Sequence, residues 1–278
     1  MSEKIKKALQ EINEKHGVGT AMIFGETEKK ETEVILTGVP TLDKALGING
    51  LPKGKIVEVF GPEQSGKTTL TLQIIAEAQK AGGLVAFIDV EHALNTDYAK
   101  QLGVDVDSMI LSQPDSGEQA MEVMEALITS GEVAVVVIDS VAGLASRAEL
   151  DGEMGDSLPG KVARLLGQAC RKIIPITSKT NCVVIFINQL RATIGGFGYG
   201  PTETTTGGKA LRYFTCVRLD IRKVGFIKGA GEKNIGQKTK IKIVKNKFAP
   251  PHQEVEVDLI YGEGISKTSA LLDIAIEK

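Results

Sequence analysis

A phosphate-binding loop is the clearest chemical signal in the sequence. The segment GPEQSGKT matches the pattern G-x-x-x-x-G-K-[ST] and stands between an expected strand and an expected helix. Its glycines allow backbone N–H groups to close around phosphates, and the helix N-terminus adds a favourable dipole. We therefore expect Lys67 to neutralise the charge of the β- and γ-phosphates of ATP, and Thr68 to bind Mg²⁺. The expected ATP-binding residues here are Gly61, Pro62, Glu63, Gln64, Ser65, Gly66, Lys67, Thr68 and Thr69.

Carboxylates follow two of the apolar strands. Asp139 ends VVVID, and a carboxylate at the carboxyl edge of a parallel sheet is placed to hold Mg²⁺, although it could be an ordinary strand-end residue. Glu91 ends FIDVE and could orient the water that attacks the γ-phosphate. Asp89 is the alternative, because period-two alternation sends Asp89 and Glu91 to the same face of the strand. The residues by themselves leave that choice open.

Alternating strands and helices must position these groups. Apolar runs predict strands over 55–60, 84–91, 133–140 and 181–189, with helical stretches at 68–83, 117–131 and 161–180 between them. This alternation predicts an α/β fold with a parallel sheet covered on both faces. The last third contains VRLDIRKVG, TKIKIVKNK and EVEVDLIYG, whose alternation of apolar and polar residues is typical of antiparallel strands with one wet face. We expect a parallel core extended by an antiparallel edge.

The N-terminal segment is set apart from this core. Ile5, Ala8, Leu9 and Ile12 share one helical face, Gly17 is a plausible stop, and a short apolar piece at 20–24 precedes a polar linker. Such an element docks either on its own core or on a neighbouring molecule. The domains expected are a helix, short strand and linker at 1–33, an ATPase and DNA-binding core at 34–265, and a short C-terminal segment at 266–278.

Composition narrows the class of protein. The chain has 278 residues, 42% hydrophobic residues and a formal net charge of -2, as soluble globular proteins do. Twelve Lys or Arg residues against two acids between positions 209 and 247 favour phosphate partners, or else mark solvated strand faces. The cysteines are isolated in apolar surroundings and are expected to be buried free thiols. Without a signal peptide or a membrane-spanning run, we expect a cytoplasmic protein.

Two stretches fit neither periodicity. Residues 151–160 (DGEMGDSLPG) and 191–208 (RATIGGFGYGPTETTTGG) are rich in glycine or threonine. Long loops inside a compact domain are usually functional or disordered.

Motifs along the whole chain add a resemblance. The segments GPEQSGKTTLTLQ, FIDVEHAL, SQPDSGEQA, VIDSVAGL, IFINQLR, ETTTGGKAL, VRLDIRKVG, VKNKFAPP and YGEGI resemble the bacterial RecA family in order and spacing, from about residue 5 to about residue 270. The resemblance implies a RecA-like P-loop ATPase core with an N-terminal helix. It also implies an ATP- and Mg²⁺-dependent DNA recombinase that forms filaments on single-stranded DNA and pairs it with duplex DNA in DNA repair and the SOS response. Partners implied are DNA, other copies of the chain, the SOS repressor and single-strand-binding protein.

The resemblance also assigns roles in the ATP site. It selects Glu91 as the catalytic carboxylate, stacks Tyr98 on adenine and makes Gln189 the sensor of the γ-phosphate. Lys245 and Lys247 would reach ATP held by the adjacent protomer, the arginine-finger logic performed in trans by lysines. Tyr213 and the N-terminal helix and strand would belong to the interface between protomers. Asn95 replaces an Asp of the family near the adenine, so the polarity of that contact is altered.

The two irregular loops match the family's DNA-binding loops. Phosphate contacts, which carry little base information, would come from arginines and from backbone N–H groups of a turn, and one apolar side chain would wedge between bases. The residues implied are Arg164, Arg171, Arg191, Ile194, Thr206, Gly207, Gly208 and Lys209. Pro159, Gly167 and Lys209 depart from the family pattern.

Two further expectations remain. The motifs end before the family's C-terminal lobe and acidic tail, so we expect a short version of the family. Other uses of the same core are a hexameric helicase and a DNA-binding paralogue without turnover. The matched loops and VKNK argue against the helicase, and the intact Lys67, Thr68, Glu91 and Asp139 argue against the paralogue.

Overall fold

The structure is a computed structural model, and it describes residues 1–23, 25, 31–153, 160–192, 203–229 and 231–276. The chain forms two compact units, Met1–Thr32 and Glu33–Lys278. In the first unit, helix α1 (Glu3–His16) ends at Gly17, whose φ of 102° suits glycine. The Asn13 side chain donates to the Ala21 carbonyl (2.8 Å) and accepts from its N–H (3.1 Å), which fastens the following chain. Residues 20–23 are not paired as the expected strand, because a strand needs a neighbouring strand to bond with.

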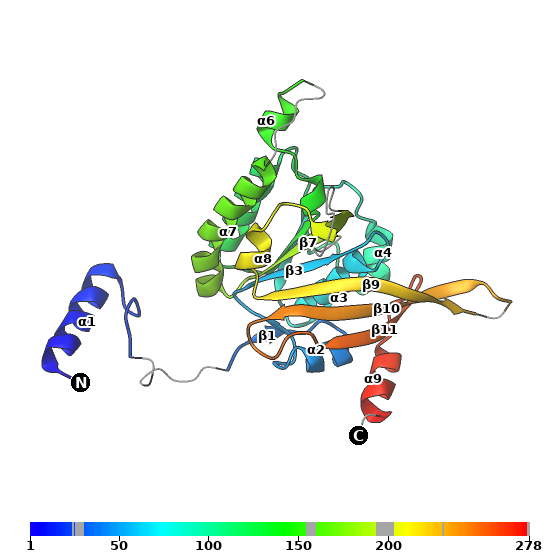
Figure 1. Ribbon diagram of the computed structural model, residues 1–278, viewed down its shortest axis with the longest axis horizontal. Coiled ribbons are helices and arrows are strands. Elements are labelled where there is room, and N and C mark those ends of the chain that lie inside the picture. The colour runs from blue at the N-terminus through cyan, green and yellow to red at the C-terminus, as the bar shows by residue number, and fades with distance from the viewer. Residues whose placement is uncertain (24, 26–30, 154–159, 193–202, 230, 277–278) are drawn as a thin grey trace, which may run out of the picture. The chain divides into compact units, whose positions relative to one another are not determined.

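The second unit is built on one large twisted sheet (Figure 1). Its strand order is β12-β11-β10-β9-β3-β7-β6-β4-β5, with β8 paired to β7 off this path. Strands β9, β3, β7, β6, β4 and β5 are parallel, whereas β10, β11 and β12 add on in antiparallel fashion. The expected parallel core with an antiparallel extension is thus confirmed. The strands are β3 (Ile56–Gly61), β4 (Leu84–Asp89), β5 (Ile110–Ser112), β6 (Val133–Asp139), β7 (Val183–Ala192), β8 (Glu203–Thr205), β9 (Val217–Lys228), β10 (Asn234–Asn246), β11 (Glu254–Ile260) and β12 (Gly264–Ile265), with a separate pair β1 (Val34–Ile35) and β2 (Leu51–Pro52).

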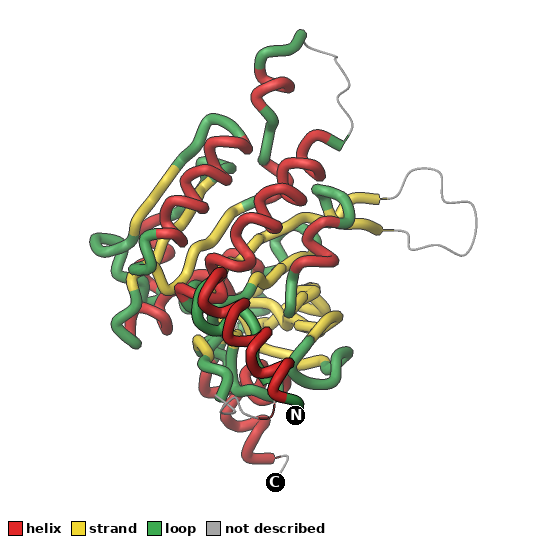
Figure 2. The backbone as a smooth tube through the Cα atoms, turned by 90° about the vertical axis from the view of Figure 1, so that its left-hand side faces the viewer, coloured by secondary structure: helices red, strands yellow, loops and turns green. Residues whose placement is uncertain are grey.

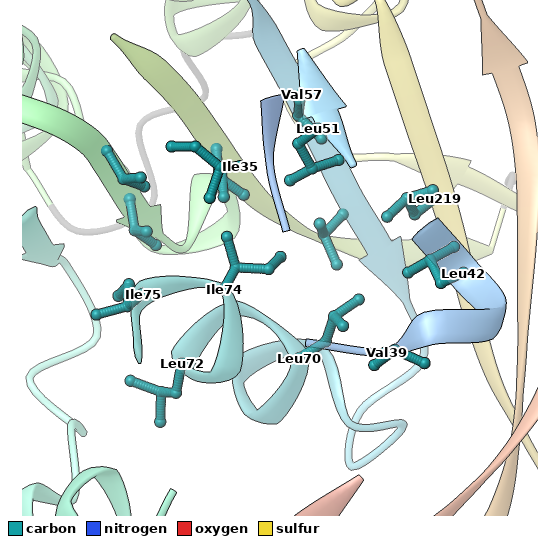
Figure 3. Close-up of a cluster of buried hydrophobic side chains, with 14 of the residues drawn as sticks. Ile35, Val39, Leu42, Leu51, Val57, Leu70, Leu72, Ile74, Ile75 and Leu219 are labelled. Atoms are coloured by element: carbon teal, nitrogen blue, oxygen red, sulfur yellow. The ribbon is translucent and has the colours of Figure 1, made fainter. Parts of the chain in front are cut away.

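Helices cover both faces of the sheet, as Figures 1 and 2 show. Alternate residues of each central strand enter different cores: Val57 packs with Leu70 and Ile74 of the helix after β3 (Figure 3), whereas Ile56 packs on the opposite face. This alternation explains the near-continuous apolar runs of the strands. The helices are α2 (Pro40–Ala45), α3 (Lys67–Lys80), α4 (Thr96–Gln101), α5 (Gly117–Thr129), η2 (Val141–Gly143), α6 (Arg147–Leu150), α7 (Lys161–Thr180), α8 (Ala210–Phe214) and α9 (Lys267–Ile276).

Two expected boundaries were wrong. Strand β4 ends at Asp89 and not at Glu91, because the N–H of Glu91 (3.4 Å) turns to the same Asp139 carbonyl of the neighbouring strand that the N–H of Val90 bonds (2.7 Å). Strand β7 continues to Ala192 and pairs with β8, so the second irregular stretch begins and ends as an antiparallel hairpin. That pairing joins segments distant in sequence, and the polar threonines of β8 give no apolar signal.

Burial in the core also shapes the ionisable groups. Cys170, Cys182 and Cys216 are free and buried as expected, and burial raises the pKa of the three thiols to about 12, 12 and 11. In the part of the chain that the structure describes, no helix is both long and apolar enough to cross a membrane.

Asp43 of α2 provides a test of the core. Its side chain is 8% exposed and accepts the Thr37 N–H (2.9 Å), and burial raises its pKa to about 6. Because the raised pKa favours the protonated folded form, stability from this group is complete below about pH 4 and is lost as the pH rises through about 6. Asp43→Asn keeps the acceptor oxygen without the charge, so we expect it to raise the free energy of unfolding at pH 8 by on the order of 2 kcal/mol.

The measurement is urea unfolding between pH 4 and pH 8. The gain should vanish near pH 4, where the parent carboxyl is protonated. Asp107→Asn, at an exposed position, is the control and should change little at any pH. A gain that is equal at both ends of the range would contradict the assignment.

Candidate functional site

The phosphate loop, residues 61–68, forms a tight turn between β3 and α3. Gln64 and Gly66 have left-handed φ values of 55° and 100°. A Cβ on Gly61 would lie 2.1 Å from the Ile221 carbonyl oxygen, and one on Gly66 would lie 2.6 Å from Leu259. Gly61 is therefore required by its close approach to the backbone of β9, and Gly66 by its left-handed φ.

Lys67 is the first residue of α3 and is 8% exposed. Its Nζ donates to the Pro62 carbonyl at 2.6 Å, which holds the ammonium group across the mouth of the loop. Burial lowers the pKa of Lys67, while the carboxylates of Asp139, Glu91 and Glu63 oppose that shift. A phosphate bound in the loop would place negative charge next to the Lys67 ammonium group.

Thr68 and Asp139 form a second pair beside Lys67. The Thr68 hydroxyl donates to Asp139 Oδ2 at 2.9 Å. Burial raises the pKa of Asp139 to about 6, with Glu91 and Asp89 adding repulsion and the Thr68 hydrogen bond opposing it. A hydroxyl and a buried carboxylate next to other carboxylates are the oxygen ligands that Mg²⁺ takes, usually together with substrate phosphates and waters. The residues therefore fit a magnesium ion.

The geometry separates Glu91 from Asp89. Asp89 is 2% exposed, and its carboxylate accepts the N–H groups of Ala93 and Leu94 and the side chain of Gln113. Asp89 thus fixes the loop after β4, whereas Glu91 is exposed and accepts from Gln189 Nε2 (3.0 Å) and from the Ser140 hydroxyl. Period-two alternation would put the two on one face only if the strand reached Glu91, and β4 ends at Asp89. Glu91 is the more exposed of the two carboxylates.

A cavity of about 400 Å³ lies beside the phosphate loop. Tyr98 lines it and shares a hydrogen bond of 2.9 Å with Thr69. Asn95 is not among the lining residues; its Oδ1 accepts the Tyr98 N–H (2.9 Å) and caps α4. The opposite wall comes from Gln237, Leu259 and Tyr261, which our sequence reasoning missed. Only Tyr261 had a signal, its place in the motif YGEGI, because β10 and β11 reach this loop through sheet pairing alone.

A second group of candidate residues lies away from the phosphate-loop edge of the sheet. We call it the opposite-edge patch, and it consists of Tyr213, Lys245 and Lys247. Lys245 lies across from Arg218 in the ladder, and Arg218 lies across from Glu58, three residues before the end of β3. A strand rises about 3.3 Å per residue. Measured along the strand direction, the two lysines therefore lie roughly 10 Å or more before the start of the phosphate loop of the same molecule. Lys245 Nζ donates to the carbonyls of Arg212 (2.7 Å) and Tyr213 (3.2 Å), and burial and the neighbouring cations lower its pKa. Tyr213 itself is 67% exposed.

The expected DNA contacts gather around a glycine turn, Thr206–Gly208. Gly207 and Gly208 have φ values of 80° and 70°, and a Cβ there would lie 2.5 Å from Leu166 and 3.0 Å from Ala163 of α7. The turn therefore rests on the start of α7, where Arg164 is exposed. Arg171, two helical turns further on, is exposed on the same face of α7.

The other candidates lie around this turn. Arg191 is exposed on β7, which pairs with β8 immediately before the turn, and Lys209 is exposed immediately after it. Gly167 lies beneath the guanidinium of Arg171. Ile194 and Pro159 lie outside the described residues.

The fold and the site define a P-loop nucleotide-binding protein of the α/β class with a mainly parallel sheet. The comparison with known families is more specific. A family model described as "RecA N-terminal domain" matches residues 3–266, and the chain belongs to that family.

Curated relatives agree over almost the whole chain. Proteins named "Protein RecA" are 54% identical over 277 residues in Agrobacterium fabrum, 54% over 278 residues in Chloroherpeton thalassium and 56% over 278 residues in Clostridioides difficile. Each match covers 99% of this chain and 76%, 77% and 79% of the respective relative.

Lys67 provides the first test of the site. Lys67→Ala removes the ammonium group held at the mouth of the phosphate loop, so we expect it to weaken binding of a magnesium–nucleoside triphosphate by roughly 10- to 100-fold. Titration calorimetry with a non-hydrolysable ATP analogue measures this. Lys80→Ala, at the exposed C-terminal end of the same helix, is the matched control and should bind as the parent does. Equal affinity in both variants would show that phosphates bind elsewhere.

Proposed function

We propose that this chain is an ATP-dependent DNA recombinase that polymerises on single-stranded DNA and pairs it with a homologous duplex. One observation supports the proposal: within a single protomer the phosphate loop and the lysines of the opposite-edge patch lie toward opposite ends of the strands, and we take them as two halves of a shared nucleotide site. The phosphate loop with Thr68, Glu91 and Asp139 lies at the carboxyl edge, and the opposite-edge patch lies behind it. Such halves meet only between protomers stacked head to tail, which generates a helical filament where the rotation does not close a ring.

In the assembled site, the chain's residues divide the work of ATP hydrolysis. Backbone N–H groups of the loop and Lys67 bind the phosphates, and Thr68 and Asp139 would hold Mg²⁺, which would supply positive charge to the phosphates. Glu91 accepts a proton from the attacking water and orients it, with Ser140 and Gln189 fixing the carboxylate. Tyr98, with Tyr261 across the cavity, would hold the adenine. Lys245 and Lys247 of the neighbour would bring positive charge to the γ-phosphate.

The DNA contacts support binding without sequence preference. Arg164, Arg171 and Arg191 offer cations to phosphates, and the glycine turn offers backbone N–H donors. We further propose that residues 1–33 dock on the neighbouring protomer and that the core, 34–265, carries both activities. We also propose a cytoplasmic location and the SOS repressor and single-strand-binding protein as further partners, on the strength of the resemblance to the family.

Complementation between two inactive variants tests the head-to-tail site. Glu91→Gln and the double variant Lys245→Ala, Lys247→Ala should each bind single-stranded DNA yet hydrolyse ATP at a small fraction of the parent rate. Mixed in equal amounts, they should regain activity, because about a quarter of the interfaces then join an intact Glu91 to intact lysines. The measurement is steady-state phosphate release with and without single-stranded DNA.

The control mixes Glu91→Gln with Lys67→Ala. Both changes lie on the same half of the site, so no mixture of them contains an intact site and no activity should return. Failure of the first mixture to recover, with both variants still assembling on DNA, would overturn the shared site. Equal turnover by the parent with and without DNA would overturn the recombinase proposal.

Salt dependence tests the DNA contacts. Arg164→Ala should weaken single-stranded DNA binding equally for different base compositions and reduce the slope of log affinity against log salt by about 0.7. Fluorescence anisotropy with two oligonucleotides over a salt series measures both effects. Lys179→Ala, at the other end of α7, is the matched control and should leave the slope unchanged. A loss confined to one oligonucleotide would indicate contacts to bases.

A further inference from the structure

A buried polar cluster, Glu58, Asn188 and Arg218, lies within the central sheet. These residues come from the adjacent strands β3, β7 and β9 (Figure 1), and their exposed fractions are 0%, 0% and 7%. Arg218 Nε donates to Glu58 Oε2 at 2.5 Å, and the guanidinium carbon lies 4.5 Å from the centre of the Phe60 ring. The pair is removed from solvent on a strand whose other residues are all buried.

Stability alone does not account for this cluster. Burying a carboxylate and a guanidinium costs several kcal/mol of desolvation, and well-packed apolar residues in place of such pairs are often neutral or stabilising. What distinguishes the cluster is the group it holds. Asn188 donates one amide hydrogen to Glu58 Oε1 (2.9 Å) and the other to the carbonyl of Thr206 (3.0 Å).

This arrangement fixes the side chain of Asn188 and, through it, the glycine turn. The amide can have only one orientation, because both acceptors need its N–H₂ group, and its Oδ1 accepts the Gln189 N–H at 2.9 Å. The N–H of Thr206 in turn bonds the Gln189 carbonyl at 3.3 Å. Both polar backbone groups of Thr206 are thus held by consecutive residues of β7, one of which, Gln189, also holds Glu91.

We propose that Asn188, held in place by the Glu58–Arg218 pair, is a positioning residue that fastens the Thr206–Gly208 turn to the strand end bearing Gln189. The chain of bonds runs from Glu91 through Gln189 and Asn188 to Thr206, so a shift of the strand end with the nucleotide moves the turn with it. Asn188 is fully buried and is not among the residues that line the nucleotide cavity. The inference rests on the proposed function, because it takes the turn to be a DNA contact.

Asn188→Leu tests this by removing both donors while keeping the branched shape. The binding of a non-hydrolysable ATP analogue without DNA should stay within about twofold of the parent, since the phosphate loop is untouched. The concentration of single-stranded DNA that gives half-maximal ATP hydrolysis should rise on the order of tenfold, the effect of one lost buried hydrogen bond. A purely structural role would lower the melting temperature without producing this split.

A matched control variant loses buried amide hydrogen bonds at a different place in the fold. Gln73 of α3 is a buried amide that bonds both backbone groups of Ile265, so Gln73→Met removes two comparable hydrogen bonds away from the turn. Its melting temperature should fall, but its half-saturating DNA concentration should not change. If the control weakens the DNA response as much as Asn188→Leu does, the specific link is wrong.

A second pair of variants keeps the test decisive if Asn188→Leu folds poorly. Asn188→Asp places a carboxylate against Glu58, and adding Glu58→Gln restores one hydrogen bond between positions 58 and 188. An ionised Asp cannot donate to the Thr206 carbonyl, so the double variant should recover the melting temperature and keep the weak DNA response. Recovery of both would overturn the proposal. A parent chain that shows no DNA stimulation would instead overturn the proposed function.

Discussion

The parallel pairing of β3 with β7 and β9 is the constraint on which the rest of the site depends. Where they pair with one another these strands are almost fully buried, so their backbone groups have no water to bond with and must be satisfied by the neighbouring strand. Because these strands are parallel, all of them end at the same edge of the sheet. This pairing brings together groups that are distant in sequence: the phosphate loop after Gly61, Asp139 and Gln189. Strong direct contacts among these groups are not needed to bring them there.

The charges at the two edges of the sheet differ in sign, and this difference explains the proposed assembly. Glu91 and Asp89 surround Asp139 at the carboxyl edge, and their negative charge adds to burial in raising the pKa of Asp139. At the other edge, burial lowers the pKa of Lys245, and the positive charges of Lys247 and the nearby Arg218 add to that shift. Within one molecule the charges at the two edges are separated by the length of a strand and cannot neutralise each other. A phosphate-bearing ligand between two molecules would contact both sets of charges.

Sequence reasoning succeeded where a pattern reports a local property and failed where an interaction joins distant segments. The phosphate loop and the alternating strands were predicted because glycine spacing and burial are written in neighbouring residues. The expected extension of β4 to Glu91 was wrong, because the end of this strand is decided by the Asp139 carbonyl fifty residues later. The β7–β8 hairpin was missed for the same reason, and Gln237 enters the nucleotide cavity only through the pairing of β10.

By itself the sequence determined the α/β class, the nucleotide loop with Lys67 and Thr68, and the resemblance that membership of the family confirms. These features follow from residue types at fixed short spacings, whose physics is local. Only the tertiary structure showed that Asp89 is buried and bonds the loop after β4 whereas Glu91 is exposed, and that Lys245 and Lys247 lie away from the phosphate loop of their own molecule. It alone showed that Asn188 ties Thr206 to the strand carrying Gln189. Hydrogen bonds across a sheet depend on register, and register is fixed only when all the strands have paired.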